Sequence, residues 1–275
     1  MKIATWNVNS IRTRLDHVLN WLYVNAVDVL CLQETKVVDE LFPQSAFESE
    51  GYQVYISGQK AYNGVALISR QALKNVQVGF TSVLGSSEAT ERFDQQKRLI
   101  CAISSPSGAE QPSLRILNLY VPNGSEIGSD KYYYKLEWLA LLEEYIQNLL
   151  QQDPCHLLIC GDFNIALEDR DIHDASERAH HIMASDLERQ ALQRVLQIGL
   201  QDAFRKFTAE GGHFSWWNYR AGGFQRNRGW RIDHQYLSKA LYQAATACTI
   251  DTAPRRLPQP SDHVPVTVEL DMAAL

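Results

Sequence analysis

The sequence lacks any stretch close to the roughly 20 consecutive apolar residues that a helix needs to span a bilayer. Its first residues, MKIATWNVNSIRTRL, also lack the charged and then apolar layout of a secretory signal. The chain contains five cysteines, an odd number, and no CxxC pair. Four of them lie in apolar runs, which predicts buried, reduced thiols rather than a disulfide framework or a zinc site. These absences favour a cytoplasmic protein with no membrane segment.

Several common enzyme motifs are absent as well. There is no GxSxG nucleophile elbow, no GxxxxGK phosphate loop, no GxGxxG turn and no HExxH zinc motif. The chemistry of serine hydrolases, P-loop nucleotidases, dinucleotide-dependent enzymes and zinc proteases is therefore not indicated.

The net charge of −6 argues against nonspecific binding to nucleic acid, but the segment 202–231 reverses it. That segment has six basic residues against two acidic ones, a local charge of +4, and aromatic residues are interleaved among them. Mixed arginine and aromatic content suits a polyanion that carries bases or sugars. The alternative for this segment is a solvated loop with a few core aromatics.

Apolar strand-like runs alternate with helical spacings along the whole chain, which predicts one α/β domain over residues 1–275. Leu15, Val18, Leu19 and Leu22 have the spacing of an amphipathic helix. Longer helices are expected from Tyr132 to Leu150 and from a Ser185–Glu188 capping box to just before Gly199. Residues 104–113 predict a hairpin loop. The expected strands are 2–6, 27–32, 52–56, 65–69, 76–80, 98–104, 114–120, 156–160, 232–238, 244–250 and 264–270.

Two stretches repeat one arrangement, an apolar strand followed at once by polar groups. VDVLCLQET (27–35) ends at Glu34, and CHLLICGDFN (155–164) ends at Asp162 and Asn164. Asp and Asn after a glycine can form a turn through side-chain to backbone hydrogen bonds, or they can deliver chemistry at a strand tip. Two such halves meeting at one rim would fit a two-sheet sandwich.

Oxygen-bearing and imidazole side chains gather beside the expected strand ends. They are Asn7, Asn9, Glu34, Asp162, Asn164, Asp233, Asp262 and His263. Hard oxygen ligands with few nitrogens select Mg²⁺, or Mn²⁺, over zinc or copper. Glu34 is the first candidate ligand, with a simple exposed strand-end glutamate as the alternative.

The stretch PSDHVPVTVEL (260–270) places Asp262 and His263 side by side before an alternating terminal strand. Asp233 lies within the otherwise apolar NRGWRIDHQYLS (227–238) and needs a partner, because burying a lone carboxylate costs several kcal/mol. We expect Asp233 to pair with His263, fixing the tautomer of the imidazole and favouring its charged form.

Seven ordered motifs, covering residue 2 to about 270, resemble the apurinic/apyrimidinic (AP) endonuclease family of exonuclease III type. The motifs are TWNVNSIR, DVLCLQETK, NGVALISR, NLYVPNG, CGDFNIALEDRDIHDA, NRGWRID and SDHVPV. The resemblance implies a deoxyribonuclease I-like fold, a four-layered α/β sandwich of two mixed sheets flanked by helices. It also implies a Mg²⁺-dependent enzyme that hydrolyses the phosphodiester 5′ of abasic sites in duplex DNA and trims 3′ ends.

The resemblance assigns roles to individual residues. Glu34 and Asn7, with Asp262 beside them, would form the metal site, and Asp162 and Asn164 are further candidate ligands. Asp162 would activate or position the attacking water with Asn164 orienting it. His263, oriented by Asp233, and Tyr120 would contact the scissile phosphate. The residues assigned to DNA binding are Trp216, Trp230 and Ile232, which would receive the flipped-out abasic sugar, together with Asn123, Arg226 and Arg228.

The chain departs from the family pattern at three places. Asn9 stands where some relatives carry Asp, which leaves that position without a carboxylate ligand. ERFDQQKRLI (91–100) lacks the acidic residue that often precedes its arginine, so Arg98 receives no role. His173, His180 and His181 have neither cysteine nor regular helical spacing around them and do not favour a second metal site.

Two other functions fit parts of the sequence. A phosphoesterase of the same fold could act on a small molecule or lipid phosphate, but it would have no evident use for the arginine and aromatic residues of 214–231. A DNA-damage binding module without catalysis would be expected to have lost Glu34, Asp162, Asp233 or His263, and all four are intact. We therefore expect a nuclease that acts as a monomer on double-stranded DNA.

Overall fold

The computed structural model describes residues 1–105, 113–176 and 178–275, and in these residues the main strands form two six-stranded sheets. The first sheet has the order β11-β12-β1-β2-β4-β3, with bounds Ala245–Ile250, Val266–Leu270, Lys2–Asn7, Val29–Gln33, Val65–Ser69 and Gln53–Ser57. The second has the order β5-β6-β7-β8-β10-β9, with bounds Leu73–Val78, Leu99–Ser104, Leu114–Tyr120, His156–Asp162, Asp233–Ser238 and Leu200–Asp202.

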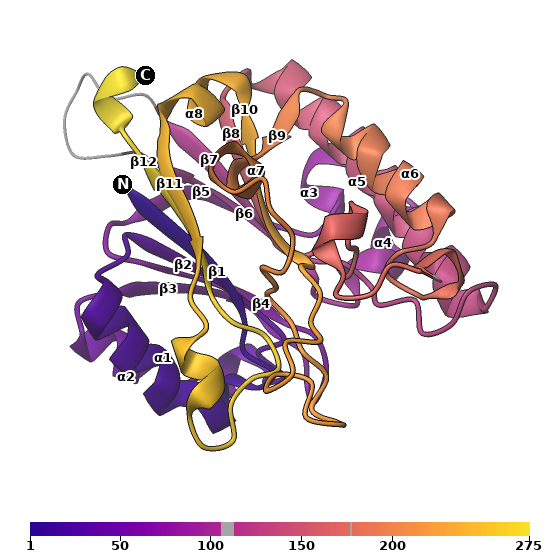
Figure 1. Ribbon diagram of the computed structural model, residues 1–275. Helices are drawn as coiled ribbons and strands as arrows, with labels where there is room; N and C mark the ends of the chain where they lie inside the picture. Colours follow the sequence, from indigo (N-terminus) through magenta and orange to yellow (C-terminus); the bar gives the residue numbers. More distant parts are fainter. Residues whose placement is uncertain (106–112, 177) are drawn as a thin grey trace.

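Helices cover the outer faces of both sheets (Figure 1), so the predicted four-layered sandwich is confirmed. Helix α1 (Ile11–Asn25) lies on the first sheet, and α5 (Asp130–Gln152) and α6 (Asp186–Leu196) lie together on the second. Shorter helices are α2 (Gln44–Ser49), α3 (Thr81–Leu84), α4 (Glu88–Asp94), α7 (Ala203–Phe207) and α8 (Lys239–Ala244). No helix among the described residues combines the length and the apolar character needed to cross a membrane.

The central core lies between the two sheets, and a second and a third core lie under the helices. Ile3, Cys31, Ile116 and Leu158 are fully buried in the central core. Strands covered on both faces must be apolar on both faces, which explains the near-continuous apolar runs of β2, β4, β7 and β8. All five cysteines are free and four are buried, as predicted.

Each sheet contains one strand–helix–strand unit with parallel strands. In the first unit α1 connects β1 to β2, and in the second α5 connects β7 to β8. Strands β2 and β8 are then joined on their other side to antiparallel β4 and β10. The repeated pattern noted in the sequence is therefore a repeated topology, and it brings the carboxyl ends of both parallel pairs to one rim.

Amide side chains connect the two sheets across the core between them. Asn118 on β7 donates through Nδ2 to the carbonyl oxygens of Leu32 and Ala66, both at 3.0 Å, and its Oδ1 accepts from Gln33 Nε2 at 2.6 Å. Gln235 on β10 donates to the carbonyls of Ile3 and Val266. These directional bonds fix the position of one sheet relative to the other, which apolar contacts alone do not specify.

Several predicted boundaries differ from the structure. The expected strand 76–80 is Leu73–Val78, because Gly79 adopts a φ of 71° and the Asp94 carboxylate accepts the backbone N–H groups of Phe80 and Thr81, which starts α3. Strand β9 and the five short helices were not predicted. Strands β6 and β7 are antiparallel neighbours, as a hairpin requires, while 106–112 of the predicted hairpin loop lie outside the described residues.

Replacing Asn118 with Ala should lower the free energy of unfolding by about 2–4 kcal/mol, because two buried carbonyls lose the donor from Asn118, the Gln33 amide loses one of its acceptors, and a cavity is left between the sheets. Denaturant unfolding measures the change. Asn148→Ala, which removes an exposed amide on α5, is the matched control and should change stability by less than about 0.5 kcal/mol. Equal effects of the two substitutions would show that the bridge between the sheets contributes little.

Candidate active site

Asn7 lies at the end of β1 between two carboxylates that come from different sheets. Its Nδ2 donates to Glu34 Oε1 and to Asp162 Oδ2, both at 2.9 Å. Its Oδ1 accepts the backbone N–H of Asn9 at 3.0 Å. Since that N–H can only donate, the carboxamide oxygen must face it, and the amino group must face the carboxylates. Asn7 therefore holds Glu34 and Asp162 together through its N–H groups.

Asp162, the last residue of β8, both forms a turn and faces the rim. Its Oδ1 accepts the backbone N–H of Asn164 at 2.9 Å, the side-chain to backbone bond expected of a turn. Its Oδ2 faces Asn7 and lies 3.7 Å from His263 Nε2. Asn164 has a left-handed φ of 50°, and its Oδ1 accepts from Asn123 Nδ2 at 3.0 Å. One oxygen of this carboxylate therefore makes the expected turn, and the other lies at the rim beside Asn7 and His263.

The predicted pairing of Asp233 with His263 is present. His263 Nδ1 lies 2.8 Å from Asp233 Oδ2, and both side chains are buried. The backbone N–H of Asp233 donates to Ser215 Oγ, and Ser261 Oγ donates to the carbonyl of Asn7. With Nδ1 committed to Asp233, the Nε2 edge of His263 is the one that faces Asp162.

Burial and charge act on these groups in opposite directions. Burial raises the pKa of Asp162 to about 7, although the charge of His263 opposes the shift. Burial alone would lower the pKa of His263, but the charges of Asp233 and Asp162 outweigh it and raise that pKa to about 10. Burial also acts to raise the pKa of Glu34, but the Lys36 ammonium, 2.8 Å from Oε2, holds it below its ordinary value. The cluster thus combines carboxylates with a charged imidazole and an ammonium at neutral pH.

Tyr120 ends β7 beside this cluster. Its phenol is removed from water and lies near Glu34, and both effects raise its pKa well above the ordinary value. The Arg98 guanidinium lies 4.6 Å from the Tyr120 ring centroid and donates to the Tyr120 carbonyl at 3.2 Å. Arg98, which received no role from the sequence, therefore supports Tyr120.

Trp216, Trp230 and Ile232 lie in one apolar cluster, as the resemblance implied. Trp230 and Ile232 are buried there, whereas Trp216 is partly exposed. Met183 packs into the same cluster with a left-handed φ of 72°, and its sulfur lies 3.5 Å from Asn123 Nδ2. No sequence pattern pointed to Met183, because a left-handed backbone conformation at a residue other than glycine cannot be inferred from one sequence.

Asp262 lies next to His263, and both of its oxygens accept hydrogen bonds from other side chains. Its Oδ1 accepts from Asn9 Nδ2 at 2.9 Å and its Oδ2 from Trp216 Nε1 at 3.0 Å. Asn9 Oδ1 in turn accepts from Lys36 Nζ at 2.6 Å. In this arrangement Asp262 orients Asn9 and Trp216, and its service as a metal ligand stays a prediction.

Half of the positive charge counted in segment 202–231 is internal. Arg231 is 1% exposed and binds Asp171 and Asp202, and Arg205 also binds Asp171. Lys206 donates to three backbone carbonyls near α8. Only Arg220, Arg226 and Arg228 are exposed, so three of the six basic residues counted in this segment are available to a polyanion.

Comparison with known proteins identifies the family of this chain. The model of the endonuclease/exonuclease/phosphatase family matches residues 4–263. The chain belongs to this family. It is 34% identical to exodeoxyribonuclease III of Haemophilus influenzae, over 98% of this chain and 99% of that one, and 32% identical to an exodeoxyribonuclease of Bacillus subtilis, over 99% and 100%.

Solved structures of the family agree with the fold. The 3′ phosphatase NExo from Neisseria, bound to a product DNA hairpin, superposes with a TM-score of 0.90 and 39% identity over 98% of this chain and 99% of that chain. An AP endonuclease from Archaeoglobus fulgidus gives a TM-score of 0.88 and 36% identity over 98% and 99%.

The donor set of this family member fits a hard divalent cation. One carboxylate oxygen each of Glu34 and Asp162 and one ring nitrogen of His263 lie within 4.8 Å of one another, and the two carboxylates are the groups free to ligate while His263 is charged. Two carboxylates favour Mg²⁺ or Mn²⁺ over softer metals. It is the one such cluster found in the part of the chain that the structure describes, and His173, His180 and His181 are not part of it.

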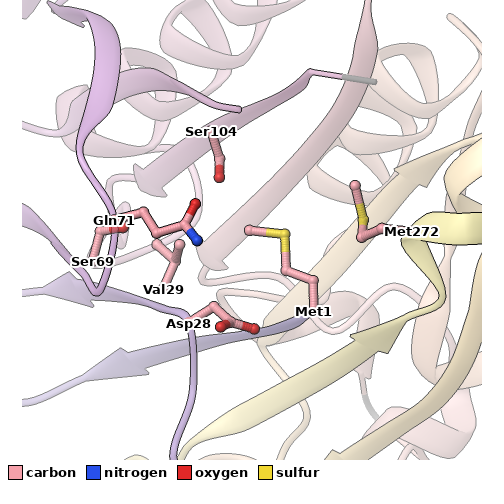
Figure 2. A pocket seen from close by; sticks show the side chains of 7 residues that line it. All are labelled: Met1, Asp28, Val29, Ser69, Gln71, Ser104 and Met272. Carbon is pink, nitrogen blue, oxygen red and sulfur yellow. The ribbon is translucent and has the colours of Figure 1, made fainter. Parts of the chain in front are cut away.

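Two cavities lie at opposite ends of the strands. One of about 510 Å³ adjoins the cluster and includes Tyr120, Asn123, Arg98, Lys131 and the exposed Tyr62 in its lining. The other, of about 250 Å³, lies where β1 and β2 begin, and Figure 2 shows its lining side chains. That second lining has one carboxylate, Asp28, whose Oδ2 accepts the backbone N–H of Lys2. The first cavity is therefore the one positioned for a substrate.

The buried Asp171 should make stability depend on acid. Burial acts to raise its pKa, but Arg231 outweighs burial and lowers the pKa to about 2, against about 3.9 in an unfolded chain. A lowered carboxyl pKa stabilises the fold above the unfolded value, and this contribution is lost as the pH falls from about 4 towards 2. Asp171→Asn should therefore cost about 2–3 kcal/mol at neutral pH and flatten the acid loss.

Unfolding free energies measured from pH 7 down to acid test this expectation. Asp169→Asn is the control, because that carboxylate is 64% exposed and pairs with Arg178 and Arg189 at the surface. Its removal should cost less than about 1 kcal/mol. If Asp171→Asn lost as much stability in acid as the wild type does, the lowered pKa of Asp171 would be contradicted.

Proposed function

We propose that this chain is a divalent-cation-dependent DNA-repair nuclease, which hydrolyses the phosphodiester 5′ of abasic sites in duplex DNA and removes residues or blocking groups from 3′ ends. The observation that carries the proposal is the meeting of Glu34, Asp162 and the Asp233–His263 pair at one rim. Relatives named exodeoxyribonuclease III and AP endonuclease support the choice of DNA as the substrate.

Asp162 is suited to take the proton of the attacking water. In this hydrolysis a water oxygen bonds to phosphorus and the bond from phosphorus to the 3′ oxygen breaks. A base works best when its pKa lies near the operating pH, and burial raises the pKa of Asp162 to about 7. The bond from the Asn164 N–H to Oδ1 leaves Oδ2 to face the reacting groups.

His263 and Tyr120 are placed to stabilise the phosphate. The charges of Asp233 and Asp162 keep the imidazole protonated at neutral pH, so its Nε2–H can donate to a phosphoryl oxygen. Tyr120, whose raised pKa keeps the phenol neutral, can donate as well. A Mg²⁺ or Mn²⁺ ion held by Glu34 and Asp162 would offset negative charge on the phosphoryl and leaving oxygens.

Duplex DNA suits the surface around the site. Exposed Arg226 and Arg228 and the cavity lined by Arg98, Lys131 and Tyr62 offer charge for phosphates and a ring for a base or sugar. The apolar cluster of Trp216, Trp230 and Ile232 would receive an extruded sugar, which costs least when no base has to be unstacked. We also propose that the enzyme works as a cytoplasmic monomer.

Incision of a labelled duplex with one abasic-site analogue tests this function. We expect a single cut 5′ of the analogue with Mg²⁺, no cut with a chelator, and far slower cutting of intact duplex. A parallel duplex with a 3′ phosphate tests end trimming. Incision that survives chelation would contradict the cation dependence, and hydrolysis of small phosphoesters without any action on DNA would favour the small-molecule phosphoesterase instead.

The same assay separates catalysis from binding. Asp162→Asn should lower turnover by at least about 10²-fold, because the base is lost. DNA affinity should stay within about threefold, since Asp162 is almost fully buried. Asp16→Asn, which removes an exposed carboxylate on α1, is the matched control. Near-normal turnover in Asp162→Asn would remove Asp162 from this role.

A further inference from the structure

A lysine and a glutamate are buried together behind the catalytic rim. Lys135 on α5 and Glu188 on α6 are both 0% exposed, and Lys135 Nζ lies 2.5 Å from Glu188 Oε1. Replacing a buried ion pair by well-packed apolar residues is often neutral or stabilising. Stability alone therefore does not account for two charges at this place.

The three donors of the Lys135 ammonium all have partners. One goes to Glu188, and the others go to the backbone carbonyls of Asn164 at 2.7 Å and Asn123 at 3.2 Å. These two residues are also joined through their side chains, from Asn123 Nδ2 to Asn164 Oδ1. Lys135 thus holds from behind the two loops that carry Asn123 and Asn164.

Glu188 ties a third loop to the same point. Its Oε1 also accepts the backbone N–H of Met183 at 3.0 Å, and its Oε2 accepts the N–H and the hydroxyl of Ser185. Met183 packs beside Trp230 and Ile232, and its carbonyl accepts the N–H of Ala166. The pair therefore connects the loop after β7, the loop after β8 and the segment before α6.

The position of Asn164 matters for the chemistry, because its N–H fixes Asp162 Oδ1. Asn164 also has a left-handed φ of 50°, a conformation that persists only when its surroundings hold it. A misplacement of about 1 Å at a catalytic group can cost about 10²-fold in rate. A donor on the Asn164 carbonyl can therefore affect turnover without touching substrate.

We propose that Lys135 is a positioning residue of the nuclease, which sets Asp162 through the carbonyls of Asn164 and Asn123, and that Glu188 is its counter-charge. The inference rests on the proposed function for its kinetic readout only.

Two variants that both lose the ion pair separate positioning from stability. In Glu188→Gln, Lys135 keeps a donor for each of the two carbonyls, so kcat should stay within about threefold of the wild type. In the double variant Lys135→Met/Glu188→Gln, kcat should fall by at least about tenfold with KM nearly unchanged, because the donors are lost. Glu137→Gln, exposed on the same helix, is the control.

Thermal unfolding of each variant is measured beside the kinetics, well below the melting temperature. A merely structural role predicts that kcat follows the fraction folded. If the double variant keeps the kcat of Glu188→Gln, or if Glu188→Gln loses as much kcat as the double variant, the proposal is overturned. If the double variant does not fold, Lys135→Gln/Glu188→Gln replaces it. The same fall in kcat is expected, since the glutamine side chain at position 135 is one bond too short to reach the two carbonyls.

Hydrogen exchange gives a readout that does not depend on activity. Peptides covering 121–126 and 163–167 should exchange faster in the double variant than in Glu188→Gln, while the rest of α5 and α6 does not change. Equal exchange in these two segments would overturn the proposal even if the wild type proved inactive on DNA. A wild type inactive on DNA that still shows faster exchange in the double variant would instead refute the proposed function and support the positioning by Lys135.

Discussion

Carboxylates from two different sheets lie within hydrogen-bond reach of one amide, and the site depends on that contact. Asn7 donates to Glu34 in its own sheet and to Asp162 in the other. Two like charges this close are tolerable only with positive charge nearby, which Lys36 and His263 supply in part. The remaining negative charge suits a divalent cation and a phosphate that arrives with it.

The fold produces this contact by repeating one unit. Each sheet carries a parallel strand–helix–strand pair, and the two pairs end at the same rim. Asn118 and Gln235 fix the sheets against each other, so Asn7 and Asp162 meet within hydrogen-bond distance. Left-handed residues, among them Glu34 and Asn164, then turn the chain at the strand ends so that polar groups follow apolar runs without a gap.

Much of this architecture could be predicted from the sequence, because apolar periodicity and capping are local signals. The main strands, the helix after the Ser185 capping box and the Asp233–His263 pair were all expected. The buried carboxylate of Asp233 needs a charged or hydrogen-bonding partner, and the sequence offered few residues that could serve as one.

Other features could not be predicted, because they depend on contacts between distant segments. In the sequence, Lys135 looks like an exposed lysine on an amphipathic helix. No residue near it in the chain indicates that Glu188 lies beside it in the fold. Arg231 was counted as surface charge, although Asp171, 60 residues away, neutralises it inside the fold. The orientation of the Asn7 amide follows from one backbone N–H, that of Asn9, which no sequence pattern specifies.

The most direct measurement of the central claim is an anomalous difference map from crystals soaked in Mn²⁺. The account predicts a peak beside the carboxylates of Glu34 and Asp162, and its loss in crystals of Glu34→Gln. A map with no peak there, or with its strongest peak at a carboxylate outside this site, such as Asp28 in the other cavity, would contradict it.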